Sequence, residues 1–168
     1  MAVLREAEAS DAALISRIIA NSWRGAYQEL IDPVYLARLP EETWLPSMRT
    51  WLDSGRMYGL IAMENELPVG CVIYGRARDE DHSNWGEIVS LYVLPETMGK
   101  GIGTQLMQAA CDALMEDGYR RVYLWSIKGN ARAERFYRRC GFAHTADEIS
   151  YHLGGRTMSD IRLVRTEE

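Results

Sequence analysis

Residues 91–103 read Leu91-Tyr92-Val93-Leu94-Pro95-Glu96-Thr97-Met98-Gly99-Lys100-Gly101-Ile102-Gly103, an apolar strand followed by a glycine-rich turn and the start of an amphipathic helix. Glycine lets the backbone turn tightly and brings its N–H groups close to a ligand without a Cβ in the way. The first turn of a helix adds unpaired N–H donors and the positive end of the helix dipole. This segment therefore predicts a site for an anion, above all a phosphate group.

The spacing disfavours two familiar phosphate-binding motifs. A P-loop requires Gly-Lys followed by Ser or Thr, but Gly101 follows Gly99-Lys100, so no hydroxyl is placed to hold magnesium. A dinucleotide fingerprint requires an acidic residue about 20 positions further on, at the end of the next strand. Here that strand ends in Trp125 and Ser126, which disfavours a nucleotide-binding oxidoreductase.

Two segments in the right order carry a family resemblance. The first is Met98-Gly99-Lys100-Gly101-Ile102-Gly103 after Val93-Leu94-Pro95. The second is Asn130, a helix that ends in Phe136-Tyr137, and then Gly141-Phe142. Together they resemble the GCN5-related N-acetyltransferase (GNAT) family, although Met98 stands where the family motif has Gln or Arg. The resemblance implies an acetyl-CoA-dependent N-acetyltransferase that acts on a primary amine.

The expected elements follow the fold order of that family. Apolar periodicity and turn residues predict, by residue number, a strand 3–7, a helix 12–22, helical segments 33–39 and 41–52 broken by Pro40 and Pro46, a hairpin 58–63 and 69–75, a strand 87–93, a helix 101–116, a strand 122–126, a helix 131–140 and a hairpin 146–153 and 157–164. This order predicts an α/β fold, a mixed and mostly antiparallel central sheet with helices on both faces. We expect one N-acetyltransferase domain over residues 1–168.

Composition agrees with an ordinary folded enzyme domain. The 168 residues are 47% hydrophobic and 26% charged, and their net charge is −5. No apolar run reaches the roughly 20 residues that span a bilayer, and the N-terminus lacks a signal-peptide segment, so we expect a cytoplasmic protein without membrane contact. Cys71, Cys111 and Cys140 are widely spaced and fit buried thiols in a strand and two helices; no metal site is predicted.

The charges are unevenly distributed. Residues 97–142 carry eight Lys or Arg and four acids, a net of +4, so the remainder carries −9. A basic segment suits a polyanionic cofactor and an acidic remainder suits a cationic acceptor, although solvated helix faces account for most of the arginines. The acidic chain as a whole does not indicate nucleic-acid binding.

Transfer of an acetyl group to an amine requires a base, donors for the oxyanion and a proton for the departing thiolate. Alternation along the strand places Glu87 on one face with Val89, Leu91 and Val93, and makes it the candidate base; a strand-end carboxylate that only faces water is an equal alternative. Tyr137, on the inner face of its helix, is the candidate acid, because the family's Tyr at this position commonly protonates the CoA thiolate.

The resemblance, the helix start and the strand backbone give the expected cofactor contacts. These are Leu91, Tyr92, Val93, Met98, Gly99, Lys100, Gly101, Ile102, Gly103, Thr104, Asn130, Arg132 and Tyr137. The backbone of residues 91–93 would pair with the pantetheine arm and supply the oxyanion contact. Asn130 also suits a helix N-cap.

The acceptor is less readable than the cofactor. The early helical region is rich in aromatic residues, and an acidic segment, Asp79-Glu80-Asp81, precedes Glu87; the aromatics are Trp23, Tyr27, Tyr35, Trp44 and Trp51. Aromatics with acids suit a cation, but helical spacing favours a core role. We expect a small-molecule or peptide amine, and a homodimer is left open. The main alternative is a catalytically silent acyl-CoA-binding sensor.

Overall fold

The computed structural model describes residues 2–167 and contains one seven-stranded sheet in the order β1-β2-β3-β4-β5-β7-β6. The strands are β1 (Val3–Glu6), β2 (Met57–Glu64), β3 (Leu67–Arg76), β4 (Gly86–Val93), β5 (Arg121–Ile127), β6 (Ala143–Leu153) and β7 (Arg156–Thr166). All neighbours are antiparallel except β4 and β5, which are parallel. The expected mixed, mostly antiparallel sheet is confirmed.

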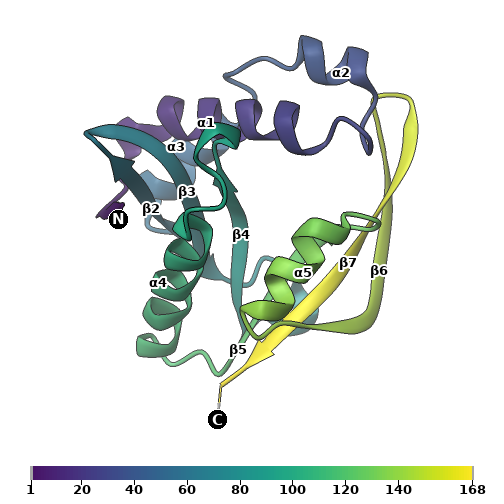
Figure 1. Cartoon of the computed structure of the whole chain (residues 1–168). Helices are drawn as coiled ribbons and strands as arrows, with labels where there is room; N and C mark the ends of the chain where they lie inside the picture. The colour runs from purple at the N-terminus through teal and green to yellow at the C-terminus, as the bar shows by residue number, and fades with distance from the viewer. Residues whose placement is uncertain (1, 168) are drawn as a thin grey trace.

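Helices cover both faces of the sheet, also as expected (Figure 1). The helices are α1 (Ala12–Ala26), α2 (Pro33–Arg38), α3 (Leu45–Ser54), α4 (Ile102–Glu116) and α5 (Ala131–Arg139), with single 3₁₀ turns at Ala9–Asp11, Glu80–His82 and Pro95–Thr97. One core cluster lies between the sheet and α4, and a second lies between the sheet and the α1 and α3 helices. A smaller third cluster joins α2 to the β6–β7 hairpin.

Two boundaries in the N-terminal helices differ from the prediction. Helix α1 continues four residues beyond Ser22, to Ala26. Pro46 does not break a helix but stands in the first turn of α3, where its missing N–H has no helical partner to lose. Residues 41–44 form a turn, so the second predicted helical segment begins four residues late.

Left-handed residues close the two hairpins. Asn65 and Glu66 both have positive φ, which is the geometry of a tight two-residue turn, so the β2–β3 turn is shorter than the gap between the predicted strands 58–63 and 69–75. Gly154 and Gly155 serve the β6–β7 hairpin in the same way. Both of its strands extend past the predicted ends.

The parallel strands β4 and β5 are paired only at their beginnings. Gly86 pairs with Val122 and Glu87 with Tyr123, and beyond that point the strands share no register. In Figure 1, β4 and the β6–β7 hairpin diverge toward the end of the sheet where α1 and α2 lie. The sheet therefore has a V-shaped opening between β4 and β5, closed at Glu87 and open beyond it.

A bulge in β4 changes which side chains share a face. Ile88 is opposite Tyr74 and Ser90 is opposite Ile73, so Val89 has no partner on β3. After the bulge, Leu91 and Val93 pack in the α4 cluster, whereas Val89 and Tyr92 pack in the α1–α3 cluster. The expectation that Glu87 shares a face with Leu91 and Val93 was wrong, because one extra residue reverses the alternation.

The three cysteines are free thiols that differ in burial. Cys71 on β3 and Cys111 on α4 are buried as expected, but Cys140 is only half-buried and follows the last residue of α5. Within residues 2–167, none of the helices has the length and apolar character to cross a membrane.

Candidate active site

The glycine-rich loop before α4 forms a cradle at the open end of the V. Gly99 and Gly101 have φ of 82° and 80°, which only glycine adopts without strain. Added Cβ atoms there would meet nothing within 4 Å, so backbone conformation, not crowding, requires these glycines. Gly103 differs: its Cβ would lie 3.3 Å from the Phe136 ring, so it allows α4 to approach α5.

Helix α4 presents free donors to the cradle. Gly101 is its N-cap and has no side chain, and helix geometry leaves the N–H groups of Ile102, Gly103 and Thr104 without helical partners. A hollow of about 310 Å³ adjoins this turn between α4 and α5, and Thr104, Arg139 and Arg165 are among the residues that line it. These features suit an anion.

Two side chains of the loop, Met98 and Lys100, are less suited to bind an anion than the loop backbone is. Met98 is 39% exposed and offers no charge. The Lys100 ammonium lies 2.9 Å from Oε1 of Glu64 on β2, so it already has an anionic partner. The backbone donors of the cradle therefore carry most of the capacity to bind phosphate.

Helix α5 lines the V-shaped opening on the side of β5. The Asn130 side chain accepts a hydrogen bond from the Ala133 N–H, which confirms the predicted N-cap, and Arg132 is exposed beside it. Tyr137 faces inward and packs against the rings of Phe136 and Phe142. Burial raises the pKa of the Tyr137 hydroxyl, and Tyr92 and Cys140 raise it further, so the phenol keeps its proton at neutral pH.

The backbone of β4 lines the V opposite α5. Leu91, Tyr92 and Val93 pair with β3 on one side only, since β5 has diverged on the other. Alternate N–H and C=O groups of an antiparallel strand point away from its neighbour, so part of this edge faces the opening. The edge can accept an extended chain as an added strand.

Glu87 lies at the closed end of the V and is fully buried. Its Oε2 is 2.6 Å from Nη2 of Arg78, and its Oε1 accepts hydrogen bonds from the Arg78 N–H and the Tyr123 hydroxyl. The carboxylate therefore neither faces water nor stands free on an apolar surface, the two environments expected from the sequence. Tyr92 stands five residues further along β4; because the bulge takes up one of them, the separation along the strand is about 13 Å at the usual rise per residue.

The face of the sheet covered by α1 holds polar groups that sequence reasoning missed. The Tyr92 hydroxyl accepts a hydrogen bond from Nε1 of Trp23 at 3.0 Å and lies 3.3 Å from the Tyr27 hydroxyl. Asp160 on β7 accepts a hydrogen bond from the Tyr151 hydroxyl at 2.8 Å. Only the aromatic richness of α1 signalled this cluster, because Asp160 and Tyr151 come from the distant hairpin.

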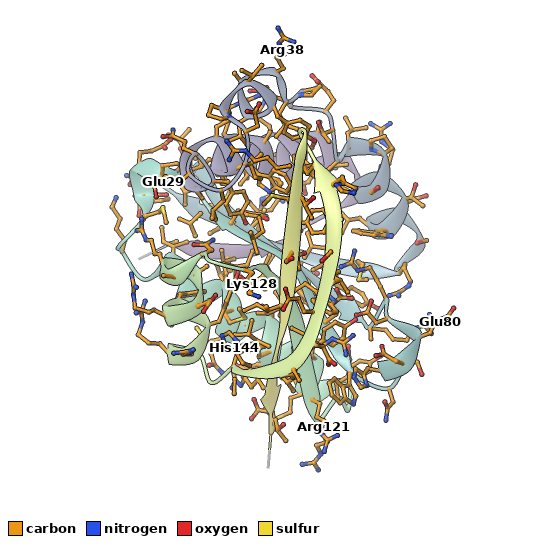
Figure 2. All side chains as sticks on the ribbon, turned by 90° about the vertical axis from the view of Figure 1, so that its right-hand side faces the viewer. Glu29, Arg38, Glu80, Arg121, Lys128 and His144 are labelled. Atoms are coloured by element: carbon orange, nitrogen blue, oxygen red, sulfur yellow. The ribbon has the colours of Figure 1, made fainter. Side chains whose placement is uncertain are left out.

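The acidic segment before β4 is occupied by an arginine. Arg162 on β7 is 4% exposed and its guanidinium contacts Asp79, Asp81 and Asp147. It also lies over the rings of Trp125 and Tyr123, at 4.6 and 5.1 Å from their centroids. Figure 2 views the β6–β7 hairpin from outside, with the loop that carries Glu80 at its side. The predicted cation-binding acids therefore already bind a cation of the protein.

The remaining aromatics pack in the core, the role that helical spacing favoured. Trp23 and Trp44 form a tilted ring pair with 4.8 Å between ring centroids, and Trp51 belongs to the same cluster. Tyr35 joins the smaller cluster under the β6–β7 hairpin. Within residues 2–167, no three His, Cys, Asp or Glu side chains are grouped so as to hold a metal ion.

Comparison with known proteins identifies the family. Residues 23–142 match the family model described as the acetyltransferase (GNAT) family. An uncharacterised N-acetyltransferase of Archaeoglobus fulgidus is 32% identical over 144 residues, 80% of this chain and 88% of that protein.

Solved structures share the fold over almost the whole chain. The PaiA N-acetyltransferase of Thermoplasma acidophilum, in complex with coenzyme A, has a TM-score of 0.80 at 18% identity, with 99% of each chain covered. YncA of Salmonella typhimurium, a putative acetyltransferase with its cofactor acetyl-CoA, has a TM-score of 0.75 at 21% identity and covers 100% of this chain and 95% of its own. The chain is therefore a member of the GNAT acetyltransferase family.

Proposed function

We propose that the protein is an acetyl-CoA-dependent N-acetyltransferase that acts on a primary amine of a small molecule or peptide. One observation carries the proposal: the V between β4 and β5 opens where the α4 cradle, the free β4 edge and the Tyr137 hydroxyl meet. Two solved relatives of this fold hold coenzyme A or acetyl-CoA. A cytoplasmic location and a homodimer stay predictions.

Each wall of the V has a role in this proposal. Backbone N–H groups of Ile102, Gly103 and Thr104 bind the pyrophosphate, with Arg132 and Asn130 at the start of α5 beside it. The β4 edge at Leu91–Val93 pairs with the pantetheine arm and directs an N–H at the thioester oxygen. Acetyl-CoA supplies the acetyl thioester.

The chemistry is a direct transfer with two proton movements. The acceptor nitrogen loses a proton, its electron pair forms the C–N bond, and the C–S bond breaks. Tyr137 donates its proton to the departing thiolate, which its inward position supports. Glu87 is the proposed base; because it is buried and hydrogen-bonded to Arg78 and Tyr123, a proton relay must connect it to the acceptor nitrogen.

Thiol release from acetyl-CoA across a panel of primary amines tests the function. We expect release that depends on the amine and yields one N-acetylated product for each molecule of thiol. Binding of acetyl-CoA without thiol release for any amine would instead establish the acyl-CoA sensor, because the cradle would be intact and the chemistry absent.

A further inference from the structure

Asp160 is a carboxylate with one uncommitted oxygen at the open end of the V. Its Oδ1 accepts the hydrogen bond from Tyr151, whereas its Oδ2 has no hydrogen-bond partner among residues 2–167. The residue is half-buried, and burial raises the pKa of its carboxyl group, against the lowering effect of the Tyr151 hydrogen bond. A half-buried carboxylate oxygen without a donor is a binding group for a cation.

Strand register places Asp160 level with Tyr92 across the opening. Glu87 of β4 pairs with Tyr123 of β5, and Asp160 pairs with Ile127, four residues after Tyr123. Tyr92 follows Glu87 by five residues, of which the bulge consumes one. The two side chains therefore stand at the same height on opposite arms of the V.

Both side chains also face the same side of the sheet. Asp160 alternates with Met158, which packs against α2 and the end of α1, and Tyr92 points to Trp23 and Tyr27 of α1. Burial is the main cause of the raised pKa of Tyr27 and of Tyr92; as the smallest of several causes, the Asp160 charge raises both, which agrees with its place on the same side of the sheet. Tyr137 likewise contributes to the raised pKa of Tyr27.

We propose that Asp160 binds the ammonium group of the acceptor through Oδ2, on the side of the sheet that also holds the Tyr27 and Tyr92 hydroxyls. A primary alkylamine is an ammonium ion at neutral pH, and Asp160 provides the counter-charge at the level of the β4 edge. Asp160 thereby makes the enzyme selective for cationic amines. The inference rests on the proposed function and adds the charge class of its acceptor.

Two probes of similar shape separate charge recognition from general binding. Benzylamine is an ammonium ion at neutral pH and aniline is neutral. In Asp160→Asn, the KM for benzylamine is expected to rise about 10- to 100-fold, the range for loss of a hydrogen bond to a charged group, with kcat and the KM for aniline unchanged. Tyr151→Phe removes the hydrogen bond that orients the Asp160 carboxylate. It should raise the benzylamine KM to a smaller extent.

Glu148→Gln is the matched control, because it removes one negative charge from the same hairpin at a side chain that binds Lys128. It should leave both KM values unchanged. Equal benzylamine KM values in the wild type and Asp160→Asn would overturn the inference, as would a fall in kcat alone. If neither amine is acetylated, calorimetric binding of benzylamine to the CoA-bound wild type and Asp160→Asn decides the role of Asp160, while the amine panel tests the proposed function separately.

Discussion

Single side chains in this protein have roles that depend on partners far away in sequence. Tyr137 has no hydrogen-bond partner within the described residues, and its burial keeps the phenol protonated. Glu87 has the opposite surroundings, since Arg78 and Tyr123 occupy both of its oxygens. The two proposed catalytic groups therefore differ in what their substitution would disturb.

Replacing Tyr137 by Phe keeps the ring packing and removes the proton donor. Turnover at saturating substrate should fall roughly 10²-fold or more, while acetyl-CoA affinity changes little. Steady-state kinetics with equilibrium binding of acetyl-CoA measures both quantities. Turnover equal to that of the wild type would assign Tyr137 to the core alone.

Replacing Glu87 by Gln should lower turnover most near neutral pH. Activity should partly recover at alkaline pH, where the acceptor amine has lost its proton in solution. The measurement is kcat against pH, with urea unfolding alongside, because Arg78 loses its partner. Tyr123→Phe, which keeps the Glu87 charge, should retain the wild-type shape of the profile. A profile of wild-type shape in Glu87→Gln would refute the base.

At the scale of elements, the sequence predicted what local signals determine. The glycines that begin α4, the Asn130 cap and the glycine turns act on their own neighbours, so β4, α4, β5 and α5 lie close to their predicted bounds. The β4 bulge depends on pairing with β3, and the partners of Glu87 and Asp160 come from other strands. A linear pattern contains none of these contacts.

The positive φ of Gly101 makes the α4 cradle sensitive to substitution. Gly101→Glu places a side chain at φ of 80° and a negative charge beside the proposed pyrophosphate site. Acetyl-CoA at a hundredfold excess over its Kd should stabilise the wild type by about 2.7 kcal/mol and the variant not at all. Thermal unfolding with and without acetyl-CoA measures this. Gly118→Glu, at another left-handed glycine beyond the end of α4, controls for backbone strain. A normal rise in Tm for the Gly101 variant would place the site elsewhere.

Across the whole molecule, Arg162 joins segments that no backbone ladder connects. It links Asp79 and Asp81 of the loop before β4 to Asp147 on β6, and it lies over the rings of Tyr123 and Trp125. This contact fixes the loop against the second half of the sheet. Charge clustering in the sequence had suggested a substrate site at the same acids.

Arg162→Met should destabilise the fold by roughly 1.5 kcal/mol or more, because it removes the charge-assisted hydrogen bonds of a buried guanidinium to Asp79, Asp81 and Asp147. Urea unfolding measures the change. Lys128→Met is the control: its ion pair with Glu148 is solvent-exposed, so its loss should cost less than about 1 kcal/mol. Equal stability of the two variants would contradict the assigned role of Arg162.

Two residue pairs, Gly86–Val122 and Glu87–Tyr123, form the backbone ladder between β4 and β5. The two parts of the sheet on either side of them contain different groups of the candidate site. The part built from β1 to β4 and α4 contains the cradle that is proposed to bind the pyrophosphate, whereas the part built from β5 to β7 and α5 contains Tyr137 and Asp160. A small rotation about the Glu87–Tyr123 pair would change the distance between the cradle and Tyr137, while every antiparallel ladder would stay intact. A ligand bound to both parts would add contacts between them beyond these two backbone pairs and the side-chain bonds of Glu87 and Arg162.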